Sequence, residues 1–156
     1  MTTTARNTNA TANPNTLVGK GIAGIIGGLA GGLVFGIMMQ IMGLMPMIAA
    51  MVGAESVIVG WVVHLAISSF IGVTYAVLLA PASSMVMAVV TGLGWGLLWW
   101  VLGPLLIMPT ALGMGVFMIN QTTLLSLVGH LIFGAILGTV ATVWLHMTQE
   151  GRGVQA

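Results

Sequence analysis

The chain has 156 residues, of which 58% are hydrophobic and only 3% charged, and its formal net charge is +1. Because a soluble domain carries about 25% charged residues, this composition indicates an integral membrane protein surrounded by a lipid bilayer. There is no Cys and no Asp, which excludes disulfides, thiol chemistry and catalysis by an aspartate dyad. Three cations cannot form a basic patch, so we expect no nucleic-acid partner.

Residues 1–16 are rich in Thr and Asn and almost free of large apolar side chains. Such a segment buries too little apolar surface to stay folded, so it is predicted to be a disordered tail. It lacks the basic start, apolar run and small-residue cleavage site that are typical of a signal peptide. We therefore expect no cleaved leader.

Four apolar stretches are long enough to cross a hydrocarbon core, which needs roughly 20 residues. Together they predict an all-α polytopic membrane domain over residues 17–148, followed by a tail over 149–156. The predicted spans cover about residues 18–44, 57–80, 85–108 and 123–146.

An even number of spans places both termini on the same side of the membrane. Arg6, Lys20 and Arg152 flank that side. The positive-inside rule therefore predicts cytoplasmic termini in the inner (plasma) membrane.

The two outer connections, Met45–Ser56 and Pro109–Thr122, are unusually apolar for loops that face water. We expect them to lie in the membrane interface or against a partner. Near the end of the third span, Gly103 and Pro104 should kink or end the helix, because proline removes a backbone donor.

The second and fourth spans resemble each other. An offset of 66 residues superposes His64 on His130 and Gly72 on Gly138, and an offset of 63 aligns the first span with the third. The sequence therefore predicts two helical hairpins in the same orientation, a parallel repeat with a pseudo-two-fold axis along the membrane normal.

Gly24, Gly28, Gly32 and Gly36 recur every fourth residue, which places them on one face of the first span. Overlapping GxxxG steps of this kind let two helix backbones approach closely in lipid. The predicted role of this face is helix packing, either within the chain or between copies.

Each histidine of the repeat heads a stripe of small residues at i+4 spacing. Both should lie about 12 Å inside the outer boundary, because each is about eight residues into its helix. An ionisable side chain within a span is a functional-site hypothesis, although a neutral imidazole bonded to a backbone carbonyl is an equally good interpretation. The candidate cofactor-binding residues are His64, Ser68, Gly72, His130, Gly134 and Gly138.

Three kinds of function fit this pattern. The first is axial ligation of a haem or related tetrapyrrole by the two histidines, with the small residues giving room for the ring. The second is copper, since imidazole and thioether ligands suit Cu(I) and the 13 Met are numerous. The third is a pathway for a proton or small solute, for which one copy has too few polar residues and an oligomer is expected. The methionines expected near the histidine level are Met38, Met39, Met42, Met45 and Met108.

Two segments, Gly60-Trp61 with His64 and Trp99–Pro104 followed by Met108-Pro109, are similar to those of small prokaryotic membrane proteins with four spans. The resemblance covers spans two to four and implies the four-span fold. It implies no activity.

We therefore expect a non-enzymatic membrane subunit that assembles with itself or with a larger energy-transducing membrane complex. His64 and His130 are the candidate ligands of a haem-like cofactor or, less favoured, of copper. A small oligomeric transporter or channel is the alternative.

Overall fold

The computed structural model describes residues 16–153, and every regular element in this part of the chain is helical. The elements are α1 (Leu17–Ile41), α2 (Met45–Ala50), α3 (Val57–Leu79), α4 (Met85–Leu102), the π-helical segment η2 (Gly103–Ile107), α5 (Met108–Ala111) and α6 (Gln121–Gly153). Four helices are long and apolar enough to cross a membrane, the third being α4 together with η2 and α5. The prediction of a helical, multi-pass membrane protein is confirmed at this level.

The ends of the spans differ slightly from the predicted bounds. The first helix ends at Ile41, three residues early, because the chain turns through Gly43, whose φ of 71° favours glycine. The last helix continues to Gly153, so most of the predicted C-terminal tail is helical. The predicted N-terminal tail lies outside the described residues, except for Thr16, whose hydroxyl accepts a hydrogen bond from Gly19 N at 3.1 Å.

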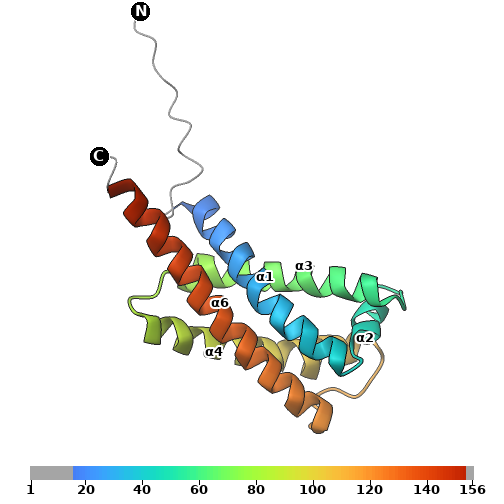
Figure 1. Cartoon of the computed structure of the whole chain (residues 1–156). Coiled ribbons are helices and arrows are strands. Elements are labelled where there is room, and N and C mark those ends of the chain that lie inside the picture. Colours follow the sequence, from blue (N-terminus) through green and yellow to red (C-terminus); the bar gives the residue numbers. More distant parts are fainter. Residues whose placement is uncertain (1–15, 154–156) are drawn as a thin grey trace, which may run out of the picture.

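Helices α1 and α6 lie against each other in the centre of the bundle (Figure 1). The α3 helix packs mainly on α1 and α4 mainly on α6, whereas α3 and α4 have little contact with each other. The start of α1 and the end of α6 lie at one end of the bundle, and α2 lies at the opposite end (Figure 1). We refer to this second end as the loop end.

The α1 glycines contact α3 of the same chain. A Cβ atom added at Gly24 or Gly28 would overlap the backbone of Gly72 or Ser68, so the two backbones touch directly. Further along the same face, Gly36 lies against the indole ring of Trp61. The partner of this face is thus an intrachain helix, which the sequence alone left open.

Glycines on other faces allow two more close approaches. Gly27 and Gly31 bring α1 against α6, where an added Cβ would meet the backbone of Phe133 or Leu137. In the second hairpin, a Cβ at Gly92 would overlap the backbone oxygen of Gly134 on α6. Close backbone contact therefore holds all the main helix pairs together, as is common in lipid, where apolar burial drives association weakly.

The third span changes its helical form where the sequence predicts a break. The α-helical part ends at Leu102, and five residues of π-helix with Pro104 near their start follow. A π-helical segment widens the helix and shifts its later side chains around the axis, and such segments are frequent at functional sites. This irregular segment forms one wall of the candidate site.

Candidate functional site

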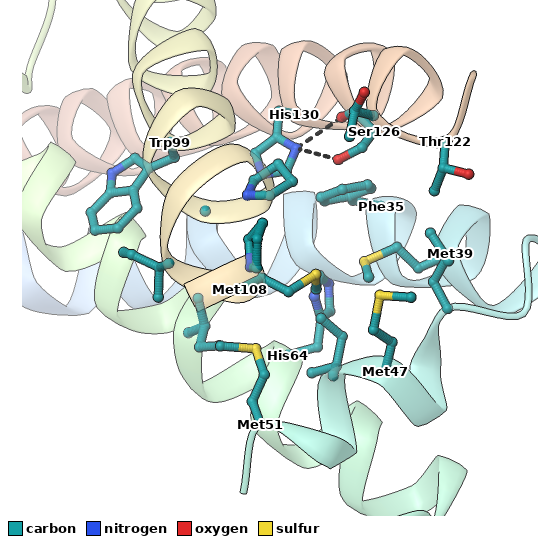
Figure 2. A pocket seen from close by; sticks show the side chains of 18 of the residues that line it. Phe35, Met39, Met47, Met51, His64, Trp99, Met108, Thr122, Ser126 and His130 are labelled. Carbon is teal, nitrogen blue, oxygen red and sulfur yellow. Dashed lines mark hydrogen bonds between the residues drawn. The ribbon is translucent and has the colours of Figure 1, made fainter. Parts of the chain in front are cut away.

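A cavity of about 500 Å³ lies near the loop end of the bundle and is lined by both predicted histidines (Figure 2). One side is formed by α1, α2 and α3. The other side is formed by η2, α5, the connection after them and the first turns of α6. The cavity is therefore enclosed between the two hairpins, at the point where α3 and α4 have little contact.

His64 is almost completely buried and bonded to the neighbouring helix. Its Nε2 lies 2.9 Å from the backbone oxygen of Gly32, and 6% of the residue is exposed. A carbonyl oxygen only accepts, so Nε2 carries the proton and donates. Its ring also meets the edge of Trp61 at a centroid distance of 6.2 Å.

His130 also bonds to a backbone oxygen, but through Nδ1 where His64 uses Nε2. Its Nδ1 lies 2.8 Å from the backbone oxygen of Ser126 and 3.3 Å from the hydroxyl of the same residue (Figure 2). Nδ1 therefore donates to the carbonyl oxygen. A Cβ added at Gly103 of η2 would lie 3.8 Å from His130 Nε2, so this nitrogen approaches the π-helical segment.

Each neutral imidazole thus keeps one nitrogen without a proton. These nitrogens are Nδ1 of His64 and Nε2 of His130, and neither has a hydrogen-bond partner among residues 16–153. Both belong to side chains that line the cavity. In this tautomeric state the two imidazoles present two hydrogen-bond acceptors in a mostly apolar cavity.

The ring of Phe35 lies against both histidines. Its ring centroid lies 5.6 Å from that of His64 and 4.7 Å from that of His130, with edge-to-face geometry in both pairs. The ring also lies against Gly129, where an added Cβ would overlap it. Sequence reasoning missed Phe35 because it is an ordinary apolar residue of the first span, and the position of Gly129 opposite it depends on how α1 packs on α6.

The small residues that were predicted to give a cofactor room do not all line the cavity. Ser68 lines the cavity, but Gly72, Gly134 and Gly138 do not. These three glycines contact the backbones of Gly24, Gly92 and Ala88 on neighbouring helices. They serve helix packing in this structure, and the space that they were expected to give a tetrapyrrole is taken by the neighbouring backbones.

Methionines gather at the cavity to an extent that their spacing in sequence does not reveal. Six methionines of the described part of the chain line it, and Figure 2 shows several of them around the cavity. Of the five methionines expected near the histidines, Met39 and Met108 are among the lining residues. The full set is Met39, Met47, Met51, Met108, Met114 and Met118.

Trp99 of α4 forms part of the cavity wall. Its ring meets the edge of Phe70 at 6.0 Å and that of Trp95 at 6.4 Å, so these rings fill the gap between α3 and α4. Its Nε1 is the only fully buried side-chain nitrogen or oxygen without a partner in the described part of the chain. A buried donor left without an acceptor is unfavourable, which makes this indole a further polar feature of the site.

The cavity is partly open. Its exposed lining residues are apolar on α3 and η2, where they are Ile67, Phe70 and Ile107, and include the polar Asn120 and Thr122 near the start of α6. Exposed apolar side chains on spanning helices face lipid tails. The part of the lining on α3 and η2 is thus suited to contact with the bilayer.

Residues 16–153 contain no group of three or more His, Cys, Asp or Glu side chains placed to hold a metal ion. A metal at this site would therefore need the methionine thioethers as additional ligands.

The fold and cavity together define the class of protein, an all-helical, multi-pass membrane protein with an enclosed polar pair in an apolar bundle. Comparison with known protein families, curated proteins and solved structures gives no match to the chain. The function is therefore argued from the site itself.

Proposed function

We propose that the chain is a non-enzymatic membrane subunit that holds a small ligand or cofactor in the cavity between its hairpins. In this proposal it acts as an accessory or scaffolding component of a larger membrane complex or of a homo-oligomer. The observation that carries the proposal is the pair of unbonded imidazole nitrogens in one cavity. Polar side chains within a membrane are costly, and a purely structural histidine would need only its bond to a carbonyl.

A haem held by both histidines fits the cavity poorly. Two-sided ligation needs the imidazoles on opposite faces of one ring, whereas the Phe35 side chain lies against both of them. Nε2 of His64 is already committed to Gly32, so ligation would have to use the more crowded Nδ1. A tetrapyrrole bound through His130 alone, or a smaller ligand, agrees better with these contacts.

Copper is the second candidate, and the methionines favour it. Thioether sulfur and neutral imidazole are soft ligands that select Cu(I) over harder ions. Six lining methionines and two histidines offer more such donors than one ion needs. Against this, Met also fills irregular apolar gaps, and a cavity of about 500 Å³ is much larger than an ion requires.

The internal repeat is part of the proposal, and equivalent helix contacts support it. Gly28 meets the backbone of Ser68, and Gly92 meets that of Gly134, which corresponds to Ser68 at an offset of 66 residues. On the first and third spans the two contacting glycines are one residue out of register with the offset of 63. The two hairpins thus pack in a similar way, with α3 against α1 and α6 against α4. A duplicated hairpin explains why both histidines reach one cavity.

We further propose that the termini are cytoplasmic and that the loop end lies outside, in the inner membrane. In cells, cysteines introduced at Thr3 and Ala54 are expected to react with a membrane-impermeant maleimide from opposite sides, with only the second labelled from outside. The chain has no Cys of its own, so each variant carries a single reporter. Labelling of the Thr3 variant from outside would reverse the orientation.

A bound ligand should remain with the protein when it is purified from its native membrane in mild detergent. Visible spectroscopy, metal analysis and mass spectrometry of the extracted lipophiles should detect a tetrapyrrole, copper or an organic molecule, respectively. His64→Ala and His130→Ala are each expected to lose it, because each removes one of the two open nitrogens. His146→Ala is the matched control, since His146 lies outside the cavity.

Two results would contradict the proposal. One is a preparation that contains none of these three kinds of ligand. The other is a ligand retained equally by all three histidine variants.

A further inference from the structure

We propose that the cavity binds a membrane-soluble aromatic diol, a quinol, whose hydroxyl groups donate hydrogen bonds to His64 Nδ1 and His130 Nε2. This inference rests on the proposed ligand-holding function and specifies the chemical class of the ligand. It concerns binding only and requires no electron transfer by the chain.

The hydrogen-bond roles at the site determine which groups the ligand must carry. The carbonyl oxygens of Gly32 and Ser126 fix the protons on His64 Nε2 and His130 Nδ1. Both nitrogens that remain are acceptors, so a matching ligand must donate twice. A carbonyl compound or an ether has acceptors only and would leave them unpaired.

The walls favour an aromatic ring between these acceptors. The rings of Phe35, Phe133 and Trp99 line the cavity together with flexible methionine side chains. Aromatic rings pair edge-to-face with a bound ring, and thioether sulfur packs favourably at ring edges. About 500 Å³ lies within the usual range for small-molecule sites, which are mostly apolar with a few placed polar groups.

The exposed apolar part of the lining favours a ligand that arrives from the bilayer. On α3 and η2 the exposed lining residues Ile67, Phe70 and Ile107 are apolar, so a hydrocarbon tail can extend past them into lipid. No charged side chain of the described residues lines the cavity. A neutral headgroup on an apolar tail meets both conditions, whereas an anionic lipid headgroup would find no cation.

Because both imidazole nitrogens are acceptors, the site should bind the reduced ligand, the quinol, more tightly than the oxidised ligand, the quinone. A quinol presents two donors to two acceptors, whereas the corresponding quinone presents only carbonyl oxygens. Burying two acceptors against two acceptors forfeits both hydrogen bonds and leaves the polar atoms unsatisfied. The reduced form should therefore bind much more tightly, although both forms have nearly the same size and apolar surface.

The test compares three short-chain ligands with the same ring substituents and tail: a quinol kept reduced under argon, its dimethyl ether, which differs only at the oxygens, and the quinone. Each is titrated into the detergent-solubilised full chain, freed of bound lipophiles, and binding is followed by equilibrium dialysis. Loss of one hydrogen bond of ordinary strength weakens binding about fivefold. We expect the quinol to bind at least about tenfold more tightly than the ether or the quinone.

Variants then connect this preference with the two histidines. His130→Ala and His64→Ala should each weaken quinol binding about fivefold while changing ether binding little. His146→Ala should keep the full preference, since His146 lies outside the cavity. Loss of the Met108 thioether in Met108→Leu would weaken a Cu(I) site, whereas quinol binding should still depend on both histidines in this variant. Thermal unfolding of each variant identifies the folded samples, and His130→Gln replaces His130→Ala if the latter unfolds.

Equal affinity for the quinol and its dimethyl ether would overturn the inference. So would a quinol preference that survives both histidine substitutions. Either result leaves the ligand-holding function in place if the native preparation contains a different ligand that depends on the histidines. If that preparation contains no such ligand, the proposed function fails as well.

Discussion

Gly28→Ala is expected to destabilise the folded protein by about 1–3 kcal/mol, the usual cost of forcing an extra carbon into a packed site. A Cβ atom at Gly28 would overlap the backbone oxygen of Ser68 and approach Gly72. Backbone atoms cannot rotate away as a flexible side chain can, so α1 and α3 must separate. Separation weakens every close contact along this helix pair, including the bond from His64 to Gly32.

Gly94→Ala is the matched control, because an added Cβ at Gly94 meets nothing within 4 Å. In an exposed helix position, alanine is favoured over glycine by up to about 1 kcal/mol, so this variant should be neutral or slightly more stable. Unfolding of both variants by sodium dodecyl sulfate, followed by circular dichroism, measures the difference. Equal effects of the two substitutions would show that close backbone contact at Gly28 contributes nothing.

Phe35→Ala is expected to have an effect of similar or larger size. The ring is 6% exposed and meets both His64 and His130, and removing a buried Phe costs about 3–5 kcal/mol in soluble cores. The substitution also enlarges the cavity by the volume of the ring, and it removes the ring contact that holds each imidazole in place. Loss of stability should therefore be accompanied by loss of ligand retention.

Phe70→Ala removes the same side chain from the cavity rim, where Phe70 is 59% exposed. Because lipid tails contact this ring already, its removal creates little empty space and should cost much less stability. The same unfolding measurement and the analysis of extracted ligands apply to both variants. If Phe70→Ala were as harmful as Phe35→Ala, the central place given to Phe35 would be incorrect.

Much of the architecture follows from local sequence. The length and apolar character of the spans identify four membrane helices, since a bilayer requires about 20 apolar residues per crossing. The break after Leu102 follows from Pro104, which has no backbone donor. These features depend on residues close together in the chain, so they can be predicted without knowing how the helices pack.

Helix ends and glycine partners were predicted less well. The turn at Gly43 ended α1 early, although apolar residues continue past it. The spacing of Gly24 and Gly28 identifies a close-packing face, but any helix with a small-residue face can be its partner. Only the folded chain assigns that face to α3, and it also uses Gly27 and Gly31, on another face, to contact α6.

The local pattern of residues is enough to place two histidines within spans of a chain that crosses the membrane. It cannot show that both imidazoles meet one cavity, with Phe35 against both and six methionines around them, because this depends on how the helices pack. The physical reason is that the cavity is built from segments far apart in sequence. Its shape depends on the distances between helices, and these are set by backbone contacts at glycines and by the π-helical segment after α4.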